Sequence, residues 1–400
     1  MGTLMSVVLI VLIVLSAAGL GMHIVVLVTA VPFLLKRDPY RDVQGFSPPV
    51  SILKPVRGLA VGDEENFRSF FHIEYPRYEI LFLVHRDAGD DPAIPCIERL
   101  IAEHPKVDAR IIRATERTAV HEKVNNYIEG IREAAYGVIC ITDADSYVDR
   151  AYLSRDVRPL SDPRVGLVTS FQTMNGFLCA ATAFEGLPQN FDGLAYFMGL
   201  DTLGLVNTVY GHSLLFRKSD FARVNAIDEI KDHILDDIAI GTAFCSKAGL
   251  KVAFSRTIIP TRYTYSSWKK VTGHVVRWKR FQRAKSPFIW ALGFYYDLLW
   301  GIATIALSLI VPPQASLAGV PLRSLGLWAG GVCAAVRVLC VLAFNLAYGD
   351  CMRDLRYLWT LALYDPFAVF ACIVSYFVNV FEHAGRTYRV VGDRMKQVIE

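Results

Sequence analysis

Charged side chains are missing from the start of the chain. No lysine, arginine, aspartate or glutamate precedes Lys36, and the apolar run from Val7 to Leu35 exceeds the roughly 20 residues that a helix needs to cross a bilayer. A cleaved signal peptide would have a basic start and a shorter apolar core, and both are absent. We therefore predict a transmembrane anchor at residues 1–36. Because Lys36 and two arginines follow it, the positive-inside rule places the next domain in the cytoplasm.

Motifs of several other protein classes are also absent. The eight cysteines form no CxxC pair and no metal-type spacing, which favours free buried thiols in a reducing compartment. Neither GxGxxG nor a P-loop pattern occurs, so no dinucleotide fingerprint is available. The net charge of +4 gives no argument for nucleic acid, and we predict no nucleic-acid partner. A chain that is 53% hydrophobic and 20% charged is expected to combine membrane segments with a soluble domain.

Three further apolar segments lie in the C-terminal part of the chain. They span about residues 288–311, 325–348 and 357–381. We predict transmembrane segments within 286–385, followed by a basic tail at 386–400. Asp297, Arg337 and Asp365 lie inside the apolar segments, where ionisable groups usually face a protein interior, and Asp297 with Arg337 is one possible pair. Four full spans would leave the basic tail outside, so the alternative that one segment is re-entrant or interfacial stays open.

The region between the anchor and these segments, residues 47–285, has the alternating pattern of an α/β domain. Short β-branched runs (VSILKPV, YEILFLVH, ARIIRA, GVICITDAD and VGLVTSFQ) are separated by helix-compatible stretches such as EKVNNYIEGIREAA. This alternation predicts a mostly parallel sheet with ligands at the carboxyl ends of its strands. Asp87 ends the second run, and Asp143 and Asp145 end the fourth, so acids gather at the edge where a ligand is expected.

Asp143 and Asp145 have the spacing of a metal-binding pair. Alternation along a strand would point both side chains to the same side. Mg²⁺ or Mn²⁺ prefers carboxylate oxygen and commonly bridges carboxylates to substrate phosphates, which suits a chain without a phosphate-binding glycine loop. We predict Asp145 and Asp143 as metal ligands. A solvated turn is the alternative for such a pair taken alone.

Two later motifs, LDDIAIG at 235–241 and HVVRW at 274–278, complete a pattern. With them the chain resembles membrane-bound glycosyltransferases of the GT-A fold, and among these the ceramide glucosyltransferase family with its bacterial, hopanoid-associated relatives. That family has an anchor helix, three aspartate motifs in order, a Q/RxxRW signature and a C-terminal membrane bundle. The matching positions are Asp87, Asp143 with Asp145, Asp237, and Arg277 with Trp278. On the nucleotide side, KPVRG and HEKVNN supply Pro55, Arg57 and Lys123.

The resemblance implies an inverting transfer of a sugar from a UDP-sugar to the hydroxyl of a membrane lipid such as ceramide. Glucose is the first candidate for the sugar. Asp237 would be the general base, with Asp236 raising its proton affinity, although helix capping by both acids is the alternative. A divalent cation and Arg277 would neutralise the departing UDP. Asp87 would bind the uridine, while Trp278 would form a flat wall or part of the core.

The chain departs from the family pattern at two places. His274 stands where relatives have Gln or Arg, and His121 with Glu122 stands where relatives often have Asn-Pro. His274 can still donate a hydrogen bond, so we expect it in the site. The alternative is a histidine on a helix surface without a role.

Two segments suggest contact with a lipid acceptor. Residues 176–206 contain only three charged residues, which predicts a surface dipped into the bilayer edge or, alternatively, buried core helices. Residues 269–285 contain seven Lys or Arg and no acid, which predicts a basic amphipathic helix on anionic headgroups or a solvated basic face.

Other functions remain open on the sequence. Hopanoid or diacylglycerol could replace ceramide as acceptor. A processive polysaccharide synthase shares the soluble fold but normally has more spans and a glutamine at the position of His274. A transporter with a regulatory soluble domain would use its intramembrane charges as the site. Release of UDP upon addition of lipid separates the lipid transferase from the synthase and the transporter.

Overall fold

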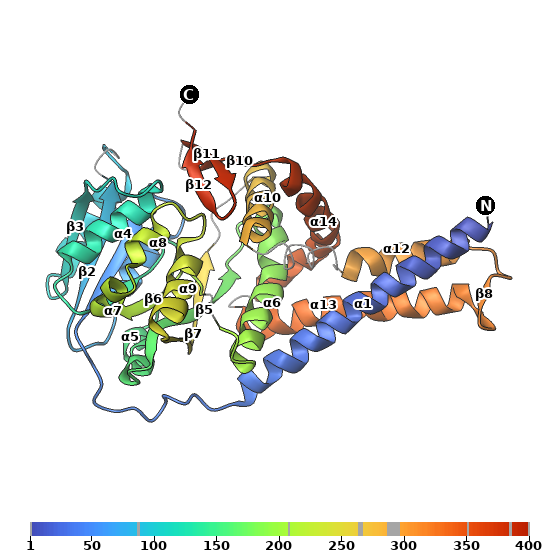
Figure 1. Ribbon diagram of the computed structural model, residues 1–400, viewed down its shortest axis with the longest axis horizontal. Coiled ribbons are helices and arrows are strands. Elements are labelled where there is room, and N and C mark those ends of the chain that lie inside the picture. Colours follow the sequence, from blue (N-terminus) through green and yellow to red (C-terminus); the bar gives the residue numbers. More distant parts are fainter. Residues whose placement is uncertain are drawn as a thin grey trace. The chain divides into compact units, whose positions relative to one another are not determined.

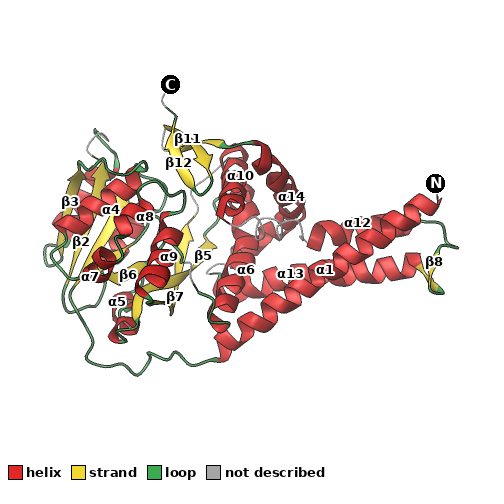
Figure 2. Cartoon of the chain, viewed as in Figure 1, coloured by secondary structure: helices red, strands yellow, loops and turns green. Residues whose placement is uncertain are grey.

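The computed structural model describes residues 2–85, 89–206, 209–262, 267–285, 297–349, 352–383 and 386–398. Its helices and strands follow one another along the chain as drawn in Figure 1, and Figure 2 distinguishes them by type. The chain forms two compact units. The α/β unit comprises Leu35–Met174, Leu200–Thr264 and Val380–Glu400, and the helical unit comprises Met1–Leu34, Asn175–Gly199 and Tyr265–Asn379.

The α/β unit is built on a seven-stranded sheet with strand order β3-β2-β1-β4-β6-β5-β7. The strands are β1 (Val50–Val56), β2 (Tyr78–His85), β3 (Asp108–Ala114), β4 (Val138–Ile141), β5 (Val165–Asn175), β6 (Leu214–Arg217) and β7 (Lys251–Arg262). The first four are parallel to one another, as the sequence predicts, whereas β6 is antiparallel to both β4 and β5. The sheet is therefore mixed. The short run LLFR of β6 carries too little pattern to be recognised as a strand in the sequence.

Helices pack on the sheet through two apolar clusters. The helices of this unit are α2 (Asp63–Phe71), α3 (Ala93–Glu103), α4 (Glu122–Glu133), α5 (Tyr152–Asp156), α7 (Lys218–Arg223), α8 (Ala226–Ile230) and α9 (Asp236–Ala248). Successive residues of β2 alternate between the clusters: Phe82 packs with α2 and α3, and Leu83 packs with α4. A Cβ at Gly130 of α4 would lie 2.7 Å from the Leu83 side chain, so only glycine permits this close approach of helix to sheet.

The last strands of the chain belong to the α/β unit. Strands β10 (Val380–His383), β11 (Arg386–Val391) and β12 (Arg394–Gln397) form a separate antiparallel sheet, referred to here as the C-terminal sheet. The amide of Met395 donates to the carbonyl of Asp232 over 2.8 Å, and Arg394 forms an ion pair with the Asp232 carboxylate. The stretch for which the sequence predicts a basic tail thus contains two paired strands.

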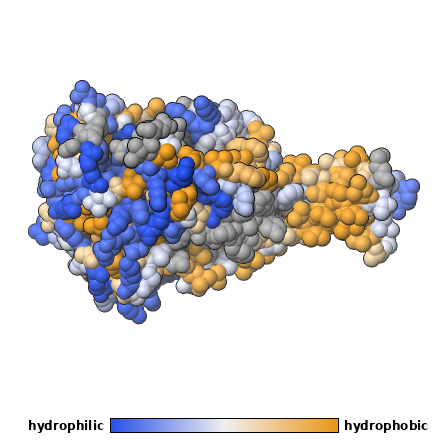
Figure 3. All heavy atoms as spheres, turned by 45° about the horizontal axis from the view of Figure 1, so that its top comes forward, coloured by the Kyte–Doolittle hydropathy of each residue, from blue (hydrophilic) through white to orange (hydrophobic). Residues whose placement is uncertain are grey.

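Among the described residues of the helical unit, three helices are long and apolar enough to cross a membrane: Gly2–Leu35, Leu322–Tyr348 and Met352–Phe377. These are α1 (Gly2–Leu35), α13 (Leu322–Tyr348) and the combination of a 3₁₀ helix, Met352–Thr360, with α14 (Leu361–Phe377). A shorter apolar helix, α12 (Asp297–Ile310), precedes a small hairpin of β8 (Ser316–Leu317) and β9 (Val320–Pro321). In Figure 3 hydrophobic surface is dense over α1, α12 and α13. The chain is a membrane protein, and the predicted anchor coincides with α1.

The described part of this unit also contains α6 (Ala180–Thr202) and α10 (Trp268–Lys285). Most side chains of α6 are buried, as the core alternative for residues 176–206 predicts. In α10, which contains the basic run, Lys279 and Arg280 are buried, whereas Lys269 and Lys270 are exposed at its start. Only part of the basic run is therefore exposed in this unit.

Arg337 of α13 lies between two carboxylates. Its guanidinium nitrogens donate to Asp365 of α14 over 3.0 and 3.2 Å and also pair with Asp192 of α6. Arg337 and Asp365 are fully buried. The predicted pairing of Arg337 with Asp297 is not tested, because the Asp297 side chain lies outside the described residues. The ion pairs tie α6, α13 and α14 together.

Candidate active site

A cluster of two carboxylates and one imidazole lies at the carboxyl end of β4. Asp143 and Asp145 follow β4, and His212 lies just before β6, the antiparallel partner of β4. His212 Nδ1 lies 3.5 Å from Asp143 Oδ2 and 3.6 Å from Asp145 Oδ1. One ligand atom from each of the three residues fits within 4.8 Å of the other two. The predicted pair of aspartates is thus joined by a histidine that the sequence reasoning missed.

The donor atoms of this cluster suit a divalent cation. Asp145 Oδ1 and His212 Nδ1 are both buried, and neither has a hydrogen-bond partner among the described residues. Buried polar atoms normally have partners, so two of them facing each other across 3.6 Å leave room for a shared ion. Carboxylate oxygens suit Mg²⁺ and Mn²⁺, and an imidazole nitrogen adds a ligand that transition metals accept readily. These residues therefore fit the predicted cation.

Two lysines flank the cluster. Lys123, in the first turn of α4, places Nζ 2.7 Å from Asp143 Oδ1. Lys54 of β1 is completely buried and donates from Nζ to the Asp143 carbonyl over 2.7 Å. Burial lowers the pKa of Lys54 to about 7. Although burial opposes ionisation of Asp143, Lys123 and then His212 hold its pKa below the usual value.

The lysines give the site positive charge beside the predicted metal ligands. Lys123 is a predicted nucleotide-side residue. The role of Lys54 is not predicted, because the sequence of an apolar strand does not indicate which group its lysine contacts. Its ammonium lies 3.9 Å from the centroid of Phe70, a cation–π contact that helps a buried charge.

Asp237 lies in the first turn of α9, beside the loop of His212. Burial and then the like charge of Asp236 raise the pKa of Asp237 to about 7, against the opposing effect of Lys123. A Cβ at Gly211 would lie 3.1 Å from Asp237 Oδ2, so the backbone beside His212 approaches the carboxylate closely. Leu235 occupies the N-cap position without a side-chain capping bond. Asp237 Oδ1 accepts from the adjacent amide of Ile238 over 2.8 Å. The usual capping geometry is therefore not what places this acid here.

The remaining predicted nucleotide-side residues lie near the end of β1 or outside the description. Pro55 is part of β1, and Arg57 follows it, exposed and paired with Glu122 at the start of α4. His121 is the N-cap of α4 and accepts from the amide of Lys123 through Nδ1 over 3.1 Å. Asp87 lies outside the described residues.

The signature residues lie on α10 of the helical unit. His274 places Nδ1 2.8 Å from Oε1 of Glu185 on α6, and its Nε2 accepts from Trp278 Nε1 over 2.9 Å. Glu185 is buried, Arg277 is half-buried, and Trp278 is 39% exposed. The structure brings Asp143, Asp145 and Lys123 together with His212. It holds His274, Arg277 and Trp278 within a different unit.

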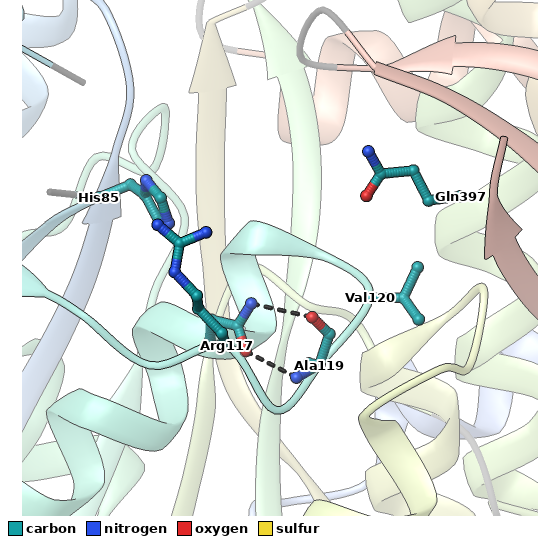
Figure 4. A pocket seen from close by; sticks show the side chains of 6 residues that line it. His85, Arg117, Ala119, Val120 and Gln397 are labelled. Atoms are coloured by element: carbon teal, nitrogen blue, oxygen red, sulfur yellow. Dashed lines mark hydrogen bonds between the residues drawn. The ribbon is translucent and has the colours of Figure 1, made fainter. Parts of the chain in front are cut away.

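A pocket of about 210 Å³ opens in the α/β unit at the carboxyl end of β2. Its lining residues are His85, Arg117, Ala119, Val120, Asn125 and Gln397. Figure 4 shows the side chains of His85 and Arg117 near each other, with Gln397 of β12 across from them. Asn125 holds the loop before α4, because its side chain bonds both the amide and the carbonyl of Ala119, over 2.7 and 2.9 Å.

Comparison with known proteins agrees with this arrangement. The family model of glycosyl transferase family 21 matches residues 9–395, which is nearly the whole chain. The chain belongs to glycosyl transferase family 21. The predicted relationship to the ceramide glucosyltransferase family is thereby confirmed. The structure also confirms the predicted α/β domain with apolar helices before and after it in the chain.

Family 21 relatives are only moderately similar in sequence. Ceramide glucosyltransferase 3 of Caenorhabditis elegans is 25% identical over 243 residues, 60% of this chain and 52% of the relative. Ceramide glucosyltransferase 1 of the same organism is 28% identical over 213 residues, 52% of this chain and 44% of the relative. The chain thus spans about half the length of the curated relatives it matches.

Among solved structures, a mannosyltransferase from Pyrobaculum calidifontis in complex with GDP-Man and Mn²⁺ is similar over 92% of this chain and 99% of its own, at 17% identity and a TM-score of 0.49.

Proposed function

We propose that this family 21 protein transfers a sugar, with glucose as the first candidate, from a UDP-sugar to the hydroxyl of a ceramide-like membrane lipid. The observation that carries the proposal is the cluster at the carboxyl end of β4. It combines cation-binding groups, Asp143, Asp145 and His212, with a carboxyl group of raised pKa in the same unit. Relatives named ceramide glucosyltransferase support the sugar and the lipid class.

The donor side of the site is built for a diphosphate. Asp143, Asp145 and His212 would hold Mn²⁺ or Mg²⁺. The cation would supply positive charge to the phosphates as the bond between sugar and diphosphate breaks. Lys123 adds a fixed ammonium beside Asp143, so the leaving group departs toward positive charge. Arg277 of the HVVRW motif remains predicted to neutralise the same charge. The nucleotide would extend from this cluster toward Pro55 and Arg57 at the end of β1. Asp87 remains the predicted contact for the uridine.

The acceptor side needs a base. The lipid hydroxyl oxygen forms a bond to the anomeric carbon as the bond from that carbon to the diphosphate breaks, and the electron pair of the broken bond leaves with UDP. The hydroxyl proton passes to Asp237. A carboxylate with a pKa of about 7 is a stronger base than an ordinary aspartate and is still ionised in part near neutral pH. Attack opposite the leaving group inverts the anomeric configuration.

The membrane position follows from the apolar helices. The spans of the helical unit would anchor the enzyme, with the α/β unit on the cytoplasmic side because basic residues follow α1. The lipid acceptor would enter from the bilayer that holds these spans, and His274 with Trp278 keeps its predicted role in the transfer.

A substrate panel tests the proposal. The full-length protein in lipid nanodiscs is supplied with Mn²⁺, one of UDP-glucose, UDP-galactose or UDP-N-acetylglucosamine, and one of ceramide, diacylglycerol or a hopanoid. UDP release is followed continuously, and the product lipid is identified by mass spectrometry. We expect ceramide with UDP-glucose to give hexosylceramide and stoichiometric UDP. Another productive pair would replace the proposed substrates, and a polymer product would identify a processive synthase. Failure of every pair to release UDP would overturn the transferase proposal.

A further inference from the structure

The C-terminal sheet is fixed to the loop and helix that border the proposed donor site. Besides the bond from Met395 to Asp232, the amide of Ile234 donates to the carbonyl of Asp393 over 3.1 Å. Tyr388 of β11 is buried, and its ring is stacked on His121, with the ring centroids 6.2 Å apart. His121 also caps α4. The sheet therefore packs on the helix end that carries Lys123.

The same docking places Gln397 in the wall of the pocket at the end of β2. Gln397 comes from β12, whereas His85 ends β2 and the rest of the lining comes from the loop before α4 and its first turn. That loop is firmly held. The amide of Val120 donates to the carbonyl of Lys231 over 2.7 Å, and Glu116 accepts from the amides of Arg117 and Thr118. Figure 4 shows Gln397 across from this loop. Because the hydrogen bonds fix the loop, Gln397 faces a preorganised surface.

We propose that the C-terminal sheet is part of the donor-binding site and that Gln397 determines base specificity by hydrogen-bonding the nucleobase in this pocket. This inference rests on the proposed UDP-sugar transfer. A carboxamide presents an N–H donor and a carbonyl acceptor in one plane, which matches the adjacent carbonyl and imide N–H of uracil. Ala119 and Val120 supply apolar surface for the face of a ring.

Helix α4 connects the diphosphate cluster to the pocket. Lys123 in its first turn reaches Asp143, and Asn125, two residues later, shapes the pocket. One helix end thus serves the diphosphate cluster and the pocket. A nucleoside diphosphate is the ligand class with a charged end for the cluster and a planar polar ring for the pocket.

Nucleotide binding to the purified full-length protein tests the inference. Titration calorimetry with Mn²⁺ measures the dissociation constants of UDP, CDP and GDP for the wild type and for Gln397→Ala, Gln397→Glu and Lys396→Ala. Lys396 is an exposed neighbour on the same strand, where alternate side chains point to opposite sides, so it is the matched control. Loss of one or two hydrogen bonds should weaken UDP about five- to tenfold in both Gln397 variants and reduce the preference for UDP over CDP. Lys396→Ala should change neither quantity by more than twofold.

The outcomes separate the inference from the proposed function. Melting temperature and Mn²⁺ affinity, measured without nucleotide, should stay at wild-type values in every variant. Should Gln397→Ala fail to fold, Gln397→Glu, which keeps size and shape, carries the test. A folded Gln397 variant with the UDP affinity and base preference of the wild type would overturn the inference. The proposed function would still stand in that case if the wild type turns over the UDP-sugar. A wild type that prefers another nucleoside diphosphate would remove UDP as donor, and the variants would then be compared with that nucleotide. A wild type that binds none of them would overturn both.

Discussion

His274 and the buried Glu185 form a pair in which Nδ1 of the imidazole lies 2.8 Å from Oε1 of the carboxylate. The other ring nitrogen, Nε2, lies 2.9 Å from Nε1 of Trp278. An indole nitrogen can only donate, so Nε2 must accept and the ring proton must sit on Nδ1, where it is donated to Glu185. The pair therefore fixes the tautomer of His274 and, through it, the orientation of Trp278.

The first prediction concerns this orienting role. Replacing His274 by alanine removes the acceptor of Trp278, and we expect turnover to fall about tenfold, the effect of losing roughly one hydrogen bond's free energy. His274→Gln keeps an acceptor oxygen for Trp278, so it should retain most activity. Both variants should bind UDP as the wild type does. Steady-state rates with the lipid acceptor and UDP titration measure these effects, and equal activity of all three proteins would show that Trp278 does not need this bond.

Much of the α/β unit was predictable because its parallel strands have strong local patterns. β1, β2, β3 and β4 are apolar runs followed by polar residues, and Asp143 with Asp145 marks the end of β4. Residues whose role depends on a distant partner were not predictable. His212 becomes part of the site only because β6 pairs with β4. No local motif indicates the four-residue strand β6 in the sequence.

The same limit applies to ion pairs and to the chain terminus. Arg337 pairs with Asp192, 145 positions earlier in the chain, a separation that no periodicity encodes. The C-terminal strands come soon after α14 in the chain. Their many basic residues led to the prediction of a basic tail. Their strand character depends on pairing with one another and on docking at Asp232. The sequence thus contained the acids of the site but not the tertiary contacts that complete it.

The second prediction tests His212 as a metal ligand. His212→Ala removes one of three candidate ligands. We expect Mn²⁺ affinity to fall at least about 10- to 100-fold, the loss typical for groups that only orient a metal ligand. Turnover should then be restored in part by excess Mn²⁺. Calorimetry with Mn²⁺ in the absence of nucleotide measures the affinity directly. Unchanged Mn²⁺ affinity in a folded variant would remove His212 from the ligand set, and full wild-type activity in excess chelator would remove the metal itself.

The third prediction concerns the buried charges of the helical unit. Arg337→Met leaves the carboxylates of Asp192 and Asp365 without their cation, and breaking a buried pair in this way typically costs about 3–5 kcal/mol of stability. Asp365→Asn keeps shape and leaves Arg337 paired with Asp192, so its effect should be clearly smaller. Melting of the detergent-solubilised proteins gives the order of stability.

A double variant strengthens this test. Arg337→Met combined with Asp365→Leu removes opposite charges together, and it should be more stable than Arg337→Met alone because fewer unpaired charges stay buried. The exposed Lys269→Met serves as a control, with no expected shift in melting temperature. An Arg337→Met protein as stable as the wild type would show that the ion pairs do not hold α6, α13 and α14 together.

The fourth prediction follows from the pKa of Asp237, which burial and Asp236 raise to about 7. A general base acts only when ionised, so turnover should rise with pH through about 7 and level off above it. Asp236→Asn removes a like charge, which lowers the pKa of Asp237 and moves the rise to lower pH while activity survives. Asp237→Asn keeps size and hydrogen bonding but cannot take the proton, so turnover should fall by about two to four orders of magnitude with UDP affinity within a few-fold.

Stability should change in the opposite direction to activity at this position. Because the pKa of Asp237 is higher in the folded protein than its ordinary value of 3.8, the folded state binds the proton more tightly than the unfolded state does. Folded wild type therefore loses stability as pH rises from about 4 through 7, where the buried carboxyl must ionise. Asn has no proton to lose, so Asp237→Asn should melt higher than wild type at pH 8, and the difference should shrink toward pH 5. A residue with a purely structural role would lower both rate and melting temperature when replaced. Single-turnover rates and melting curves at both pH values distinguish the two, and an Asp237→Asn enzyme with near-normal rate would exclude Asp237 as the base.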